Sequence, residues 1–171
     1  MLVILAGLPG TGKSTLARAV AARSGAFVLD KDAVRAALFP PALIEYSREQ
    51  DDFVLRVMLK VAGWMVRRDP RAIVVIDGRP FSQKYQLDQV IHFAEWVKTP
   101  WRIVECTCPE AIVRERIASD AHPAADRNFE LYERVRSEWQ PIEREKLVLR
   151  CELAAAGNAA RVMEYLTHAG S

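Results

Sequence analysis

The chain has 171 residues, of which 50% are hydrophobic and 27% charged, and its net charge at neutral pH is +2. This size and composition predict that residues 1–171 form one compact soluble domain, and they exclude a disordered or low-complexity protein. The nearly balanced charge does not require a polyanionic partner, although a local basic patch is compatible with it.

The apolar run at residues 1–5 is too short for a signal peptide and lacks a basic leading region, so we expect a buried strand there. The sequence nowhere approaches the roughly 20 apolar residues of a membrane span, and no membrane partner is expected. Cys106, Cys108 and Cys151 form an odd set without the spacing of a metal site. Reduced structural thiols in a cytoplasmic protein are therefore expected.

Short apolar runs alternate with longer segments of helical periodicity along the chain. The expected strands are residues 2–6, 26–29, 72–76, 102–106 and 147–149. The expected helices are residues 13–23, 33–38, 47–68, 82–97, 109–118, 128–140 and 158–168. This alternation predicts an α/β fold in three layers, with a five-stranded parallel sheet and helices on both of its faces. Ligands of such sheets bind at the carboxyl ends of the strands.

The first expected strand leads into the segment Ala-Gly-Leu-Pro-Gly-Thr-Gly-Lys-Ser-Thr at residues 6–15. Gly7, Gly12, Lys13 and Ser14 satisfy the P-loop (Walker A) motif G-x-x-x-x-G-K-[ST] between a strand and a helix, as that motif requires. Its glycines let backbone N–H groups face phosphates, its lysine lies near the transferring oxygens, and its serine hydroxyl binds Mg²⁺. The motif predicts a P-loop NTPase fold with a nucleoside triphosphate, taken as ATP, and Mg²⁺ as ligands.

We expect the whole loop to contact ATP, with Lys13 also catalytic and Ser14 also on the metal. The expected ATP-binding residues in the loop are Gly7, Leu8, Pro9, Gly10, Thr11, Gly12, Lys13, Ser14 and Thr15.

The second expected strand is followed by Asp30 and Asp32, two residues apart and beside the phosphate loop. A kinase that phosphorylates an alcohol needs a carboxylate to orient the hydroxyl and accept its proton, and Asp32 is the better candidate. Aspartate is also favoured as a helix N-cap, and position alone does not separate these two roles. Asp30 is either an outer magnesium residue or a solvated turn residue.

The third expected strand ends in Asp77-Gly78-Arg79. Asp77 stands where P-loop proteins place the carboxylate that holds magnesium, usually through water, although Asp-Gly is also common in turns. Arg79 follows into the expected cleft, where it either binds an anionic group of the acceptor or remains a solvent-facing loop residue.

Residues 3–17, V-I-L-A-G-L-P-G-T-G-K-S-T-L-A, and residues 29–35, L-D-K-D-A-V-R, resemble one group of P-loop kinases. The group includes phage and bacterial polynucleotide 5'-hydroxyl kinases, chloramphenicol phosphotransferase, zeta toxins and gluconate kinase. The resemblance implies that Asp32 is the catalytic base and that Arg35 contacts a phosphate of the acceptor. Shikimate and gluconate kinases have a similar D-x-D turn, which supports a hydroxyl acceptor more broadly than a nucleic acid.

The resemblance also implies a small helical lid at approximately residues 114–130, whose arginines fold over the triphosphate and exclude water. Its candidate residues are Arg114 and Arg116 for ATP and Arg127 for the acceptor.

The expected function is therefore an ATP-dependent kinase acting on a hydroxyl of a small-molecule or nucleotide-like acceptor. A polynucleotide 5'-hydroxyl kinase is the main alternative, but the four tryptophans lie in or beside expected helices and strands, where they are expected to pack. An NTP-dependent switch is a further alternative, although the N-K-x-D and D-x-x-G elements of guanine-binding switches do not occur. The identity of the acceptor and the oligomeric state stay open.

Overall fold

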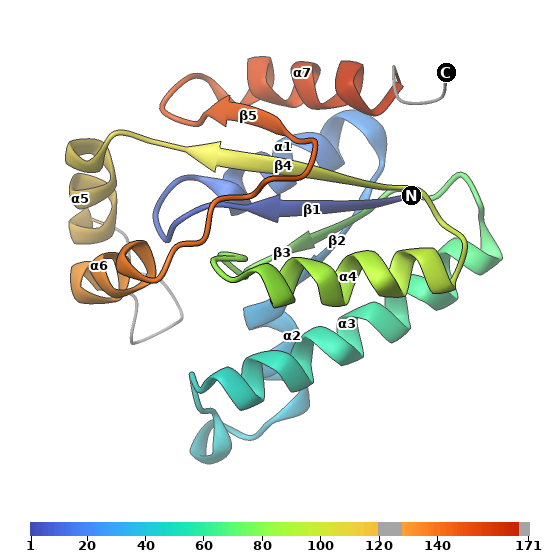
Figure 1. Ribbon diagram of the computed structural model, residues 1–171, viewed down its shortest axis with the longest axis horizontal. Coiled ribbons are helices and arrows are strands. Elements are labelled where there is room, and N and C mark those ends of the chain that lie inside the picture. Colours follow the sequence, from blue (N-terminus) through green and yellow to red (C-terminus); the bar gives the residue numbers. More distant parts are fainter. Residues whose placement is uncertain (120–127, 168–171) are drawn as a thin grey trace.

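The computed structural model describes residues 1–119 and 128–167 (Figure 1). Within these residues, five strands form one wholly parallel sheet with the spatial order β2-β3-β1-β4-β5. The strands are β1 (Leu2–Ala6), β2 (Phe27–Asp30), β3 (Val74–Asp77), β4 (Trp101–Thr107) and β5 (Leu147–Arg150). Strands β2 and β3 lie on one side of β1, and β4 and β5 lie on the other, so the strand order reverses at β1. Sheets of this kind bind ligands at the carboxyl end of the strands where the order reverses.

Helices cover both faces of the sheet (Figure 1). The described α-helices are α1 (Lys13–Ser24), α2 (Lys31–Leu38), α3 (Arg48–Arg68), α4 (Lys84–Trp96), α5 (Glu110–Ser119), α6 (Phe129–Ser137) and α7 (Ala155–Thr167), and a short 3₁₀ helix spans Pro41–Leu43. Helices α3 and α4 lie on one face, and α1 and α7 on the other. Helices α5 and α6 lie beyond the carboxyl ends of β1 and β4 (Figure 1).

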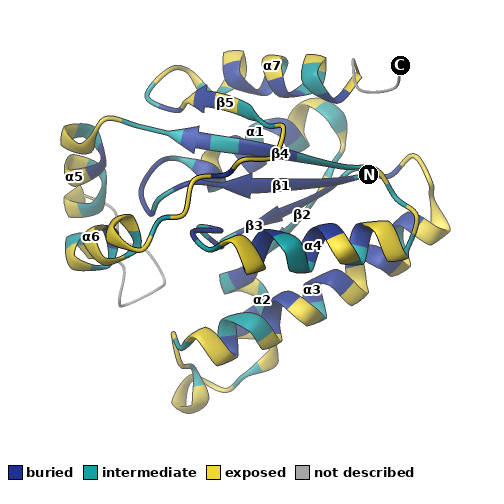
Figure 2. Ribbon diagram, in the orientation of Figure 1, coloured by how far each residue is buried: buried dark blue, intermediate teal, exposed yellow. Residues whose placement is uncertain are grey.

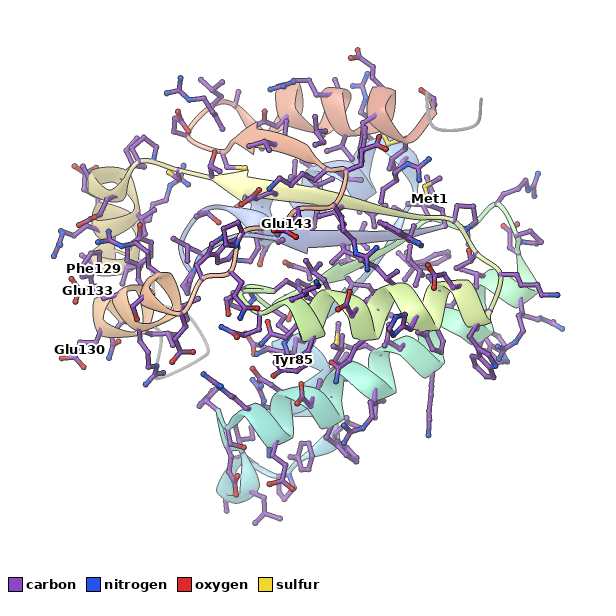
Figure 3. The ribbon with its side chains drawn as sticks, viewed as in Figure 1. Met1, Tyr85, Phe129, Glu130, Glu133 and Glu143 are labelled. Atoms are coloured by element: carbon purple, nitrogen blue, oxygen red, sulfur yellow. The ribbon has the colours of Figure 1, made fainter. Side chains whose placement is uncertain are left out.

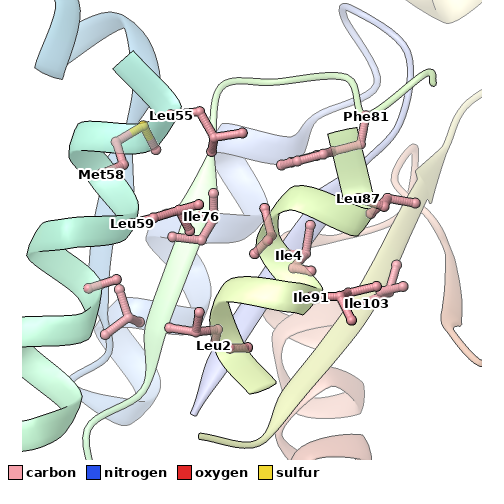
Figure 4. Close-up of a cluster of buried hydrophobic side chains, with 14 of the residues drawn as sticks. Leu2, Ile4, Leu55, Met58, Leu59, Ile76, Phe81, Leu87, Ile91 and Ile103 are labelled. Atoms are coloured by element: carbon pink, nitrogen blue, oxygen red, sulfur yellow. The ribbon is translucent and has the colours of Figure 1, made fainter. Parts of the chain in front are cut away.

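The central strand β1 is buried on both faces, as its uninterrupted apolar sequence predicts (Figure 2). Leu2 and Ile4 belong to the core beneath α3 and α4 (Figure 4). Val3 and Leu5 belong to the core beneath α1 and α7. The alternation follows from the period of two in a strand, which sends neighbouring side chains to opposite faces. Both faces of the central strand are thus packed against helices, and the phosphate loop follows at its carboxyl end.

The predicted sheet and helical layers are confirmed, but several element boundaries differ. Helix α6 ends at Ser137 instead of residue 140, because the chain then turns toward α4 and the Gln140 N–H donates to the Ser82 carbonyl at 2.8 Å. Helix α7 begins at Ala155, three residues before the expected start. Asn158 is buried one turn inside it, and its amide donates to the Arg150 carbonyl at 3.0 Å.

Of the expected lid at approximately residues 114–130, the structure describes the end of α5 and the start of α6, while residues 120–127 lie outside the described part of the chain. Across the described residues, none of the helices has both the length and the apolar character needed to span a membrane.

Candidate active site

The phosphate loop, residues 7–15, connects the carboxyl end of β1 to α1. Gly7, Gly10 and Gly12 have φ angles of 140°, 77° and 99°, a region that residues with a Cβ rarely adopt. The Lys13 ammonium lies over the loop and donates to the carbonyls of Gly7 and Leu8 at 2.8 and 2.9 Å. The motif is therefore folded as a compact loop with its lysine directed back across it.

Gly7 provides a stability test of this loop. A Cβ at Gly7 would lie 2.4 Å from the backbone carbonyl oxygen of Cys106, and its φ is positive as well. We expect Gly7→Ala to lower the free energy of unfolding by about 1–3 kcal/mol or more, measured by urea unfolding. Gly157→Ala is the matched control, because nothing lies within 4 Å of that Cβ and alanine favours the helix. Equal stability of the two variants would contradict the loop geometry.

Helix α5 packs directly on the phosphate loop. A Cβ at Gly10 would lie 2.9 Å from a Val113 side-chain carbon and 3.2 Å from an Ile117 side-chain carbon. Arg116, on the same side of α5, donates to the Cys151 carbonyl at 3.0 Å and lies 3.5 Å from the Thr11 carbonyl. The structure thus brings Arg116 to the loop, as expected.

Arg114 is held elsewhere. Its guanidinium pairs with Glu110 at 3.2 Å and lies 3.6 Å from the centre of the Phe129 ring, at the start of α6 (Figure 3). This cation–π contact joins α5 to α6 and leaves the side chain largely exposed, so the structure does not bring Arg114 to the phosphate loop. Arg127, the third expected lid arginine, lies outside the described residues.

Asp77 ends β3, beside β1 and the loop, and its side chain is 1% exposed. Within the described residues, neither of its carboxylate oxygens makes a hydrogen bond of ordinary geometry. Burial raises the pKa of Asp77, opposed by the Lys13 ammonium and the Ser14 hydroxyl. A buried carboxylate with unused oxygens next to this serine suits Mg²⁺, which prefers oxygen ligands and usually keeps waters.

The two carboxylates after β2 have different partners. Asp30 is the N-cap of α2, because its Oδ1 accepts from the N–H groups of Asp32 and Ala33 at 2.8 and 3.0 Å. Asp32 is therefore not the cap. Its carboxylate instead pairs with Arg35 at 2.5 Å and stays 25% exposed. The side chain of Asp32 is thus fixed by an ion pair while it remains accessible.

Arg35 and Arg79 are almost completely buried, at 1% and 2% exposure. Arg35 pairs with Asp51 as well as Asp32, and it lies 5.0 Å from the centre of the Tyr46 ring. Lys31 also pairs with Asp51, at 2.6 Å. The first turns of α3 thus anchor the cationic residues that follow β2.

The guanidinium of Arg79 pairs with Asp52 at 2.6 Å and donates to the Tyr85 hydroxyl at 3.4 Å, at the first turn of α4 (Figure 3). Sequence reasoning missed Asp51 and Asp52, because acidic residues in the first turns of a helix are common for dipole reasons alone.

A cavity of about 470 Å³ lies between the phosphate loop, the ends of β2 and β3, and α6. Ser14, Asp32 and Arg79 line it, and the opposite wall includes Leu131 and Arg134 of α6. Arg134 was not predicted. Arg136, two residues further along α6, pairs instead with Glu110 of α5. The two arginines differ in their position around the helix, which decides that Arg134 lines the cavity and Arg136 joins α5 to α6.

A second cavity, of about 350 Å³, lies on the other side of the loop near Arg116 and Cys151.

A phosphate loop after the central strand, a buried carboxylate at the end of the neighbouring strand and helices over the cleft together define the fold of kinase-type P-loop phosphotransferases. The chain belongs to the AAA_33 family, described as an AAA domain, whose family model matches residues 2–141. The resemblance to P-loop kinases is thereby confirmed.

Two curated proteins illustrate the sequence relationship. An adenylate kinase from Campylobacter curvus is 27% identical over 153 residues, covering 83% of this chain and 80% of that protein. A 2',3'-cyclic-nucleotide 3'-phosphodiesterase from Rattus norvegicus is 33% identical over 113 residues, but the match spans 60% of this chain and only 25% of that protein.

Solved structures share the fold at low identity. An APS kinase from Mycobacterium tuberculosis, in complex with AMPPNP and APS, has a TM-score of 0.74 at 21% identity, covering 97% of this chain and 96% of that chain. A gluconokinase from Sinorhizobium meliloti has a TM-score of 0.67 at 17% identity, covering 99% and 97%. These likenesses establish the common architecture.

Proposed function

We propose that this protein is an ATP-dependent kinase that transfers the γ-phosphate to a hydroxyl of a small-molecule or nucleotide-like acceptor. The observation that carries the proposal is the position of Asp32, which lines the same cavity as the phosphate loop and is fixed by Arg35 while staying accessible. A fixed carboxylate opposite a phosphate site is what an alcohol acceptor needs. The kinase-type fold agrees with this reading.

The donor half would be formed by residues 7–15. In this proposal the triphosphate lies along the loop, with Lys13 beside the transferring oxygens and the positive end of the α1 dipole behind them. The nucleobase of ATP would lie in the second cavity, whose wall includes Arg116 and Thr15. We assign the lid contact with ATP to Arg116 and not to Arg114, which is engaged by Phe129.

Ser14 and Asp77 would hold Mg²⁺, Ser14 by its hydroxyl and Asp77 through water. When bound, this metal neutralises negative charge on the β- and γ-phosphate oxygens. The unused oxygens of Asp77 support the assignment, and burial raises its pKa even with the Lys13 ammonium nearby, so a further positive charge would stabilise the carboxylate.

In the acceptor half, Asp32 would orient the hydroxyl and accept its proton as the oxygen bonds to the γ-phosphorus. The bond from that phosphorus to the bridging oxygen breaks, and ADP leaves. Arg35 keeps Asp32 in place, and Arg79 borders the site from the β3–α4 connection. Both arginines would support the acceptor by fixing the positions of the side chains around it.

Arg134 is assigned to the transferring phosphoryl group, because it lines the cavity and carries no ion pair within the described residues. We expect Arg134→Gln to lower kcat by about 10²-fold with little change in nucleotide affinity. Arg136→Gln is the matched control, since Arg136 lies two residues away and pairs with Glu110. Steady-state kinetics with saturating ATP measures both. A similar loss in the two variants would contradict the assignment.

The proposal is tested by acceptor-stimulated ATP consumption across nucleosides, sugars, antibiotics and oligonucleotides with free 5'-hydroxyls. Stimulation that is lost in Asp32→Ala would support the kinase. Turnover limited to oligonucleotides, with binding that weakens steeply as salt rises, would indicate the polynucleotide alternative. ATP hydrolysis that no acceptor stimulates, and that Asp32→Ala leaves unchanged, would point to the switch alternative.

A further inference from the structure

The acceptor half of the cavity is electrically neutral within the described residues. Three cationic side chains line it, and a fourth, Arg35, pairs with two carboxylates that line it. Each of the four is ion-paired with a carboxylate from the same region. The pairs are Lys31 with Asp51, Arg35 with Asp32 and Asp51, Arg48 with Glu138, and Arg79 with Asp52. These four cations thus meet four carboxylates, and none of their charges is left over for a ligand.

Burial makes this pairing difficult to exchange. Arg35 and Arg79 are at most 2% exposed, so their charges are shielded from water and depend on the carboxylates. An anionic acceptor at Arg79 would lie close to Asp52. Arg35 does not line the cavity, whereas its partners Asp32 and Asp51 do, so an anionic acceptor there would meet carboxylates. Like charges repel strongly where water is largely excluded.

The phosphate side cannot supply the missing charge. Its cations are Lys13, Arg18 and Arg134 in the cavity and Arg116 beside the loop, against the nearby carboxylates Asp30 and Asp77, an excess of two positive charges. A magnesium-bound triphosphate keeps about two negative charges at neutral pH, which uses up that surplus. Once ATP is bound, an anionic acceptor would add negative charge to a cleft without a cation to offset it.

We propose that the acceptor is an uncharged polar alcohol, sugar-like or nucleoside-like, recognised by hydrogen bonds and not by its charge. This inference rests on the proposed kinase function. The groups of the cavity that carry no charge suit such a ligand: Ser82, Gln83 and Gln86 line one side. Tyr46 adds a 39% exposed ring, which offers a flat surface to a sugar ring or a base. Arg35 and Arg79 then serve as buried supports.

The charge of the pocket can be tested without knowing the acceptor. Protein saturated with Mg²⁺ and AMPPNP, which blocks the phosphate loop, is titrated with sodium sulfate at constant ionic strength in a calorimeter. We expect no saturable sulfate binding to the wild-type protein. Asp52→Asn removes the partner of Arg79 and is expected to create a sulfate site, while AMPPNP affinity stays unchanged. Saturable binding to the wild type with a dissociation constant below about 1 mM, lost in Arg79→Gln, would overturn the inference.

A second arm compares acceptors that differ in charge and share the reacting hydroxyl. Glucose is paired with gluconate, and uridine with uridine 3'-monophosphate. We expect kcat/KM to be at least about tenfold higher for the neutral member of whichever pair is used, and Asp52→Asn to narrow that ratio. Preference of the wild type for the charged member would overturn the inference. Activity with glucose or gluconate would indicate a sugar-like acceptor, and activity with uridine or its 3'-monophosphate would indicate a nucleoside-like acceptor.

The two kinds of experiment measure separate properties of the protein. The sulfate titration reports the charge of the pocket whether or not any alcohol is phosphorylated. The loss of stimulated ATP consumption in Asp32→Ala reports the phosphoryl transfer whatever the charge of the acceptor.

Discussion

Replacing Asp32 with alanine is expected to lower acceptor-dependent phosphoryl transfer by about 10²–10⁴-fold, while nucleotide binding is retained. The carboxylate lines the cavity, is fixed by Arg35 at 2.5 Å and makes no cap for α2, so its loss removes the base without removing a structural bond of the helix terminus. Initial rates with a stimulating acceptor give the first quantity, and calorimetric titration with AMPPNP gives the second.

Asp30→Asn is the matched control for this prediction. Asp30 lies two residues away and also lines the cavity, but its carboxylate caps α2, and the oxygen of asparagine can accept the same N–H bonds. We expect this variant to lose less than about tenfold in rate. A large loss at Asp30 together with normal turnover of Asp32→Ala would reverse the two assignments.

Replacing Asp77 with asparagine is expected to have two opposite effects. Turnover should fall by about 10²-fold or more, because the carboxylate that would position magnesium is lost. The nucleotide-free protein should become more stable at neutral pH, because burial raises the pKa of Asp77 and its ionised form is held without adequate partners. Initial rates with a stimulating acceptor measure the first effect, and thermal unfolding of the nucleotide-free protein measures the second.

The sign of the pH dependence follows from the direction of that shift. A carboxyl whose pKa is raised on folding favours the folded state when it is protonated, at pH values below its ordinary range. That contribution is lost as the pH rises through the raised pKa of the folded protein. The variant should therefore exceed the wild type in Tm at neutral pH and approach it in acid. Greater stabilisation of the variant in acid than at neutral pH would contradict the interpretation of Asp77.

The parts of the fold that the sequence could predict have strong local signals. Residues 2–6 form an uninterrupted apolar run because β1 is buried on both faces, and the glycines and lysine of the next segment have few uses besides a phosphate loop. The position of Asp77 beside the loop could be predicted because it ends a buried strand. In each case the signal lies in residues that are adjacent in the sequence.

The ion pairs around the acceptor cavity could not be predicted in this way. Arg79 meets Asp52 and Arg35 meets Asp51 only because α3 crosses beside the ends of β2 and β3, and no local pattern marks that packing. Asp30 and Asp32 are both suitable caps, and only the backbone geometry after β2 selects Asp30.

The arginines of the lid differ by helical phase. Arg114 and Arg116 are separated by about 200° around α5, so they cannot both face the phosphate loop. Val113 is the buried residue of that helix, and its contact at Gly10 sets which side faces the loop. With so little apolar periodicity in α5, the sequence could not choose between the two arginines.

Kinase activity is tested most directly by the fate of the transferred phosphate, followed by ³¹P nuclear magnetic resonance during turnover with ATP and a stimulating acceptor. We expect the γ-phosphate signal to be replaced by that of a phosphate monoester on the acceptor, in step with ADP formation, and Asp32→Ala to form no monoester. Release of the γ-phosphate only as inorganic phosphate, at equal rates in the wild type and in Asp32→Ala, would contradict kinase activity.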